Sequence, residues 1–193
     1  ALKYADIGML LAKKMNWSRA INTFNTCYGT IYSTKGMYDT VMFFYRQSLA
    51  ISVKEKDSVN ITVAYNNLGS TAFAKGDFVD AANYFMLTLK ISEQINYNHL
   101  RGIALENIGN VYYYQKDYNR SLNYARQSLQ VRQEDKDEED FVSISLKLIG
   151  MNYTGLKKYD SSKKYFDAGL AMCRRFGDKS GEAIILTNYE PKH

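Results

Sequence analysis

The sequence predicts an all-α protein built from stacked pairs of antiparallel helices. Three observations lead to this expectation: a pattern that returns every 40 or 41 residues, apolar residues at helical spacing within each period, and a single proline, Pro191, in 193 residues. Proline interrupts helices, so its near absence suits long helices joined by short turns. A regular period of this size is typical of a stacked array of supersecondary units.

The repeat is visible in four aligned stretches of the chain. They read CYGTIYSTKGMY (27–38), NLGSTAFAKGDF (67–78), NIGNVYYYQKDY (107–118) and LIGMNYTGLKKY (148–159). The aligned glycines are Gly29, Gly69, Gly109 and Gly150, with spacings of 40, 40 and 41 residues. An aromatic residue then opens a second helical run in each period, at Tyr38, Phe78, Tyr118 and Tyr159. One unit is therefore predicted to be a helix, a short turn and a second helix, which makes ten helices in the whole chain.

This pattern resembles the tetratricopeptide repeat, in which an aromatic residue, a Leu-Gly pair, a tyrosine and a later small-to-aromatic pair recur at fixed positions. In one repeat these places are held by Tyr65, Leu68, Gly69, Ala72, Ala81 and Phe85, and in the next by Leu105, Ile108, Gly109, Tyr112, Ser121 and Ala125. The unit here is longer than the usual one of about 34 residues and lacks its closing proline. It is similar to the longer-helix subclass of kinesin light chains and many bacterial signalling proteins. The resemblance implies a right-handed superhelical solenoid of antiparallel helix pairs.

The register of the repeat divides the chain into six segments. We expect the second helix of an incomplete repeat over 1–21, full repeats over 22–61, 62–101, 102–142 and 143–182, and the first helix of a truncated repeat over 183–193. A start and a stop inside repeats suggest a segment of a larger protein. Apolar residues at the two ends would lack neighbours, and uncapped arrays tend to associate. The residues concerned are Leu2, Ile7, Leu10, Leu11, Ile184, Ile185 and Leu186.

Glycine and asparagine inside the first helices are explained by two opposite helix faces. Leu68 and Gly69 fall on the face that packs on the partner helix, where a residue without Cβ allows close approach. Asn66 and Asn67 fall on the other face, which lines the concave surface in stacked helix pairs. The family uses such asparagines to hold a peptide backbone, so the resemblance implies peptide binding. An alternative is that these amides bridge adjacent first helices.

The expected peptide-binding face is neutral and rich in amide and aromatic groups. Its candidate residues are Asn66, Asn67, Ser70, Phe73, Glu106, Asn107, Asn110, Tyr113, Tyr114, Lys147, Met151 and Asn188. Its only charged members, Glu106 and Lys147, hold equivalent places in neighbouring repeats and are expected to pair. Apolar Ile103, Ile144, Leu148 and Ile184 stand where family members that clamp acidic chaperone tails carry cations, which argues against that role. A single lysine on this face also argues against RNA binding.

No catalytic, metal or cofactor site is expected. His99 is predicted in a turn between repeats and His193 lies at the terminus, and no Ser/His/Asp set or phosphate-binding glycine loop appears. The acidic run EDKDEED (134–140) lacks the spacing of a calcium loop and is interpreted as a solvated turn. Cys27 and Cys173 give neither a disulfide framework nor a zinc pattern.

The predicted function is therefore a peptide- or protein-binding scaffold, such as the sensor or interaction module of a larger signalling protein. The alternatives are a structural or oligomerisation array without a free ligand, and a regulatory module of an attached enzyme such as a histidine kinase. We expect protein or peptide partners, self-association through the ends, no nucleic acid and no membrane segment within this chain. The compartment stays open between the cytoplasm, which is favoured, and the bacterial periplasm.

Overall fold

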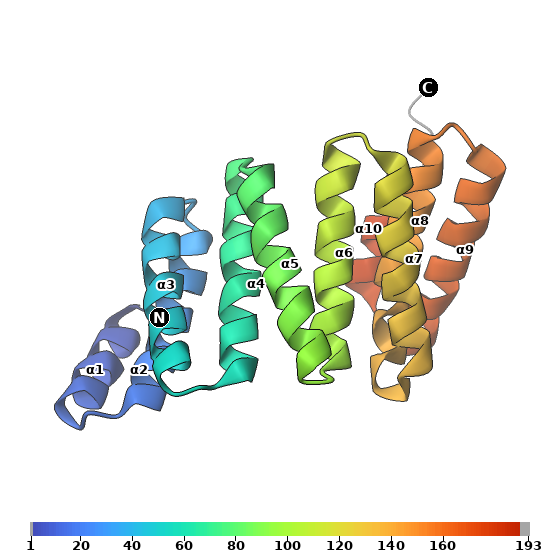
Figure 1. Ribbon diagram of the computed structural model, residues 1–193. Helices are drawn as coiled ribbons and strands as arrows, with labels where there is room; N and C mark the ends of the chain where they lie inside the picture. Colours follow the sequence, from blue (N-terminus) through green and yellow to red (C-terminus); the bar gives the residue numbers. More distant parts are fainter. Residues whose placement is uncertain (1, 190–193) are drawn as a thin grey trace. The chain divides into compact units, whose positions relative to one another are not determined.

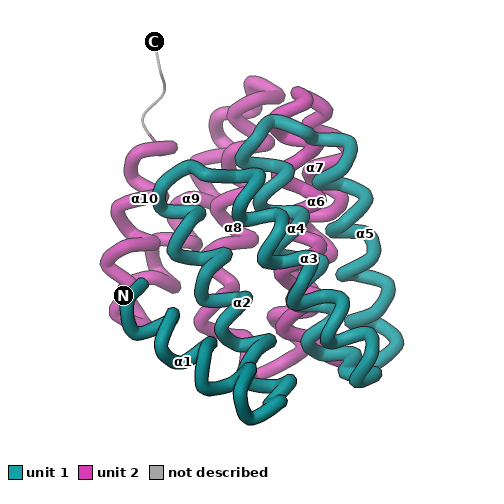
Figure 2. Tube along the Cα trace, turned by 90° about the vertical axis from the view of Figure 1, so that its left-hand side faces the viewer, with its two compact units in different colours: residues 1–95 teal, residues 96–193 magenta. Residues whose placement is uncertain are grey.

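A computed structural model of the chain describes residues 2–189, which fall into two compact units that divide after residue 95 (Figures 1 and 2). The first unit contains five helices: α1 (Leu2–Lys14), α2 (Ser18–Ser33), α3 (Tyr38–Lys54), α4 (Ser58–Lys75) and α5 (Phe78–Gln94). Consecutive helices of this unit pack against each other, and α2 with α3 and α4 with α5 form helix pairs. Ala1 and residues 190–193, which include Glu190, Pro191 and His193, lie outside the described part.

The second unit contains five α-helices and one short 3₁₀ helix. These are α6 (Asn98–Tyr114), α7 (Tyr118–Glu134), η1 (Lys136–Phe141), α8 (Val142–Gly155), α9 (Tyr159–Phe176) and α10 (Lys179–Tyr189). Here α6 pairs with α7 and α8 with α9, while α10 packs on α9. Ten α-helices and no strand between residues 2 and 189 confirm the all-α prediction.

The second helices begin where the sequence predicts. Tyr38, Phe78, Tyr118 and Tyr159 are the first residues of α3, α5, α7 and α9. The first helices start earlier than the expected repeat boundaries, at Ser18, Ser58, Asn98, Val142 and Lys179. The boundary between two repeats can be placed at any equivalent position along the repeating unit. The boundaries 22–61, 62–101, 102–142 and 143–182 therefore stay a prediction.

Residues in the left-handed backbone region close the turns between helices, at the same repeat positions. They are Gly36, Gly76, Lys116 and Lys157 after first helices, and Asn16, Lys56, Asn96 and Gly177 after second helices. At Gly76 the amide donates to the Phe73 carbonyl, which caps α4 in the way that a left-handed glycine permits. The position after α7 departs from this pattern, because Asp135 is extended and η1 follows it. The 41-residue step therefore falls in η1.

The aligned glycines lie at close contacts between helices, as predicted. A Cβ atom added at Gly69 would lie 2.6 Å from a ring carbon of Phe85, and one at Gly150 would lie 2.7 Å from Phe166. Gly29 meets the ring of Tyr45 in the same way. In each case a first-helix glycine receives an aromatic ring from its own second helix. The hydrophobic cluster of Val41, Tyr45 and Leu68 and that of Phe166, Leu170, Cys173 and Ile185 form around such contacts.

In the third repeat, the contact at the aligned glycine, Gly109, is made by a residue of the next repeat. Ala125 stands where the other second helices have Tyr45, Phe85 and Phe166, so the ring that would cover Gly109 is absent. Leu148 of α8 takes its place: its Cδ2 would lie 2.9 Å from a Cβ on Gly109, and the side chain is fully buried. The expectation that Leu148 faces the concave surface is therefore wrong, because the small Ala125 leaves a space that Leu148 fills.

The acidic run 134–140 is not simply a solvated turn. Residues 136–141 form η1, in which Glu138 is buried and its Oε1 lies 2.8 Å from Nδ1 of His99. His99 itself lies in the first turn of α6 and not in a turn between repeats. Asp135 anchors the start of the segment, since its Oδ2 accepts a hydrogen bond from Nδ2 of Asn98. The expectation failed because these contacts join residues 37 to 39 positions apart.

Candidate functional site

In the first unit, the candidate residues Asn66, Asn67, Ser70 and Phe73 lie on α4. Leu68, Gly69 and Ala72 are buried, whereas Ser70 is exposed and Asn66 and Asn67 are half-buried. Phe73 is also half-buried, and its ring packs edge-on against Phe78 at 5.5 Å between ring centres. Ala64 and Thr71, three residues before and four residues after Asn67, are buried as well, so burial on α4 is not confined to the face of Leu68 and Gly69. The assignment of these residues to ligand binding stays a prediction.

In the second unit, the candidate residues differ in how accessible they are. Glu106, Asn107, Asn110 and Lys147 are half-buried and Tyr114 is 58% exposed. Tyr113 and Met151, by contrast, pack against hydrophobic clusters of the core. Burial accordingly raises the pKa of the Tyr113 hydroxyl above its usual value. Asn188 uses its amide locally, since its Nδ2 donates to the Ile184 carbonyl at 2.8 Å.

Glu106 and Lys147 lie together in a pocket of about 320 Å³ at the N-terminal halves of α8 and α10. We refer to it as the α8–α10 pocket. Its walls are Glu106, Ser143, Ile144, Lys147, Asp178, Ser180, Gly181, Ile184 and Ile185. The pocket combines three isoleucine side chains with the carboxylates of Glu106 and Asp178 and the ammonium group of Lys147. It is therefore suited to a short segment that carries both an apolar side chain and hydrogen-bonding groups.

The expected ion pair between Glu106 and Lys147 is not formed. Oε2 of Glu106 instead accepts a hydrogen bond from Nη2 of Arg132 at 3.0 Å. Arg132 is only 1% exposed, and its Nη1 also donates to the carbonyl of Phe141 at 2.6 Å. No ion pair joins Lys147 to another residue of the described part. A buried guanidinium from α7 thus fixes the orientation of Glu106 in the α8–α10 pocket.

Arg132 is a residue that the sequence analysis missed, although a signal for it was present. It occupies the repeat position of Ser52, Ser92 and Cys173, where small side chains are buried. Gly102 faces it, and a Cβ atom there would lie 3.0 Å from Nε of Arg132. A large residue at a small-residue position, opposite a glycine, is the pattern that could have revealed this contact.

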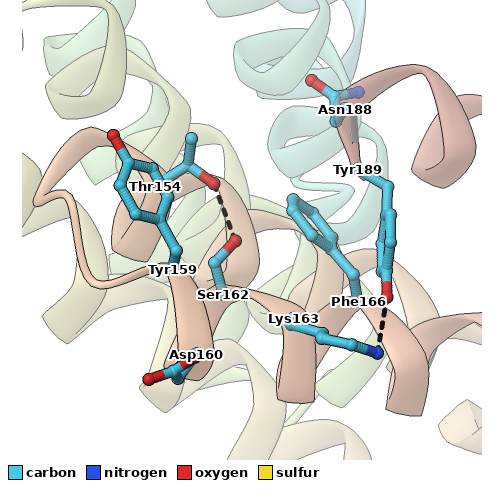
Figure 3. Close-up of a pocket in the computed structure, with 8 residues that line it drawn as sticks. All are labelled: Thr154, Tyr159, Asp160, Ser162, Lys163, Phe166, Asn188 and Tyr189. Atoms are coloured by element: carbon cyan, nitrogen blue, oxygen red, sulfur yellow. Dashed lines mark hydrogen bonds between the residues drawn. The ribbon is translucent and has the colours of Figure 1, made fainter. Parts of the chain in front are cut away.

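A second pocket, of about 260 Å³, lies between α9 and the end of α10 (Figure 3). Its lining residues are Thr154, Tyr159, Asp160, Ser162, Lys163, Phe166, Asn188 and Tyr189. Nζ of Lys163 donates to the hydroxyl of Tyr189 at 2.9 Å, as drawn in Figure 3, and to Asp167. The bond to Tyr189, followed by that to Asp167, raises the pKa of the Lys163 ammonium. These contacts fix Tyr189 against α9.

The other site classes find no support in the part of the chain that the structure describes. No group of three or more His, Cys, Asp or Glu residues between 2 and 189 is placed to hold a metal ion. None of the described helices has the length and apolar character needed to span a bilayer. Cys27 is exposed and Cys173 is buried, and both are free thiols.

Known structures resemble the chain at low sequence identity. BtubC (BKLC) from P. vanneervenii matches 97% of this chain and 79% of its own, with a TM-score of 0.83 and 16% identity. The apo form of RapI matches at a TM-score of 0.77 and 19% identity over 85% of this chain. A Rap protein complexed with Competence and Sporulation Factor matches 96% of this chain, with a TM-score of 0.76 and 16% sequence identity. The chain spans only 60% and 56% of these two Rap proteins.

The sequence itself gives one family match. Curated protein sequences show no significant similarity to the chain. Residues 60–134 match the tetratricopeptide repeat family, and this stretch covers α4 to α7 almost completely. The same helix pairs, with the same glycine-to-aromatic contacts, occur on both sides of the matched stretch. Residues 60–134 therefore belong to the tetratricopeptide repeat family, and the helix pairs on either side of them have the same architecture.

Proposed function

We propose that the chain binds an extended peptide segment of a partner protein along the faces of its first helices, as the sensor or interaction module of a larger signalling protein. Protein interaction follows from the family itself. The observation that carries the finer proposal is the α8–α10 pocket, in which two candidate residues meet between apolar walls. The Rap protein complexed with Competence and Sporulation Factor supports it as a similar fold that holds a ligand.

The chemistry of these faces suits a peptide backbone. Asn67 and Asn107 each offer an amide donor and an amide acceptor, which can pair with the C=O and N–H of one extended residue. The carboxylate of Glu106, held by Arg132, accepts hydrogen bonds in a fixed orientation. Ile144 and Ile184 in the same pocket can cover one apolar side chain.

The test is a screen of a random peptide library against the immobilised chain, followed by titration of the selected peptides. Replacing Asn67 in the first unit and Asn107 in the second unit with alanine should weaken binding by about 1–3 kcal/mol, because peptide groups held on either unit would lose their partners. Thermal unfolding of the same variant should change much less, since Leu68 and Ile108 on the opposite faces stay in place. Ser33→Ala, an exposed change on α2, serves as the matched control.

Two results would overturn the proposal. One is a library that gives no peptide whose binding the double variant weakens. The other is a large loss of melting temperature with unchanged affinity, which would mean that the asparagines hold neighbouring helices together.

A second candidate function, an oligomerisation array, is favoured by the exposed apolar surface of α1. Tyr4 is 80% exposed, Leu10 69%, Leu11 54% and Ile7 49%. A helix with this many uncovered apolar side chains is a candidate for a protein contact. On α10, Ile184 and Leu186 are also exposed, but Ile185 is buried against Phe166 and Leu170. The expectation that Ile185 lacks neighbours is therefore wrong.

We expect the chain to associate with itself in a concentration-dependent way through this α1 surface. Leu10→Glu combined with Leu11→Glu should shift the population to the monomer in light-scattering chromatography, because a charge would have to be buried in the contact. Lys13→Glu and Lys14→Glu, which change charge on exposed positions of the same helix, are the control. A wild-type chain that stays monomeric at high concentration would contradict this candidate.

A further inference from the structure

A third surface, on the second unit, is separate from the first-helix faces. It is a groove of about 750 Å³ bounded by the end of α7, η1, the start of α8 and α9. We call it the α7–α9 groove. Val142 and Leu146 form its buried floor, and Ala168, Ala171 and Met172 of α9 form one wall. Ala168 and Ala171 are exposed, whereas Val142 and Leu146 are only 4% and 8% exposed.

The groove lies where the repeat is one residue longer. After α3 and α5 a three-residue connection with one left-handed residue, Lys56 or Asn96, leads into the next first helix. After α7 the six residues of η1 intervene, and they contact α7, α8 and α9. The groove is thus a local feature of this insertion.

The charge beside the groove is opposite to that of the protein as a whole. The formal net charge of the chain is +5, yet residues 134–140 carry six carboxylates and one lysine. Asp135, Lys136 and Glu139 line the groove directly, and Asp137 and Asp140 are exposed next to them. One oxygen of Glu139 already accepts a hydrogen bond from Arg175 at 2.6 Å. The remaining carboxylates leave one side of the groove acidic.

We propose that the α7–α9 groove binds a basic amphipathic helix of a partner protein. The apolar stripe of such a helix would cover Ala168, Ala171 and Met172, and the small side chains of the two alanines would let its backbone come close. Its lysine and arginine side chains would face the acidic side at residues 135–140. Because the rest of the protein is net positive, electrostatic repulsion elsewhere would direct a basic helix to this groove.

The experiment uses a fluorescein-labelled helical peptide made only of leucine and lysine, with leucines at i, i+3, i+4 and i+7. Fluorescence anisotropy should show binding to the wild-type chain. Ala168→Gln combined with Ala171→Gln, which fills the groove without changing charge, should weaken it about tenfold. Asp137→Asn combined with Asp140→Asn should weaken it as well and should flatten its salt dependence, because charge attraction is screened by salt. Ala50→Gln, the same kind of change at an exposed position of α3, is the control.

Two further peptides separate shape from charge: one with glutamate in place of lysine, and one with serine in place of leucine. Both should bind much more weakly than the leucine-lysine peptide. Binding of the serine peptide as tight as that of the leucine peptide would overturn the proposal, since charge alone would explain it. Equal binding to wild type and to the glutamine variant would also overturn it. Circular dichroism shows whether the glutamine variant folds. If it does not, the Asp137→Asn and Asp140→Asn variant takes its place, and equal binding of the peptide to this variant and to wild type would overturn the proposal.

Discussion

Replacing Arg132 with methionine is expected to lower the free energy of unfolding by about 3 kcal/mol. The change leaves Glu106 without its buried partner and the carbonyl of Phe141 without its donor. Removing one member of a buried ion pair typically costs about 3–5 kcal/mol, and the 14% exposure of Glu106 places this case at the lower end. Urea denaturation followed by circular dichroism measures the loss.

A matched control and a double variant make this test specific. Arg126→Met, on an exposed position of the same helix, should change the free energy of unfolding by well under 1 kcal/mol. Adding Glu106→Leu to Arg132→Met should recover part of the loss, because no buried charge is then left unpaired. A loss below about 1 kcal/mol for Arg132→Met would show that water replaces the guanidinium without difficulty.

Substitutions at Gly69 are expected to destabilise the first unit in a graded way. Alanine should cost about 2 kcal/mol and valine more, because even a Cβ atom would lie 2.6 and 2.7 Å from two ring carbons of Phe85. Phe85 is 2% exposed, so its ring has little room to move away. The gain in helix propensity from glycine to alanine, about 1 kcal/mol, offsets only part of this cost.

The same pair of residues provides the internal check, measured by thermal and urea unfolding. Phe85→Leu by itself should lower the free energy of unfolding. The same change should lower it less when Gly69 is already alanine, because leucine leaves room for the new methyl group. Ser70→Ala and Ser70→Val, at the exposed neighbouring position, are the controls. Strict additivity of Gly69→Ala and Phe85→Leu would mean that the two residues do not share this contact.

The helix pairs could be predicted from the sequence because each depends on local regularity. The period of the glycines, the aromatic residues that open the second helices and the scarcity of proline all act within one repeat. The positions of Tyr38, Phe78, Tyr118 and Tyr159 as helix starts follow from this.

The failures share a different cause, which is compensation between residues of different elements. Leu148 turned inward because Ala125 is small, and Glu106 turned to Arg132 because Gly102 leaves space for a long side chain. A small residue at one position that is compensated by a large residue elsewhere can be recognised only when aligned positions are compared across repeats. Helical spacing predicts which residues share a face of one helix, whereas the α8–α10 pocket depends on contacts between three helices and could not be predicted in this way.

The glycine-to-ring contacts have a consequence for how the chain folds. Gly29 and Tyr45, Gly69 and Phe85, and Gly150 and Phe166 are each sixteen residues apart, so each contact closes a short loop. Chains dominated by such near-neighbour contacts have low contact order and fold quickly, because little chain entropy is lost before the contact forms. We therefore expect several helix pairs to act as equivalent nuclei, so that a defect in one pair slows folding less than it speeds unfolding.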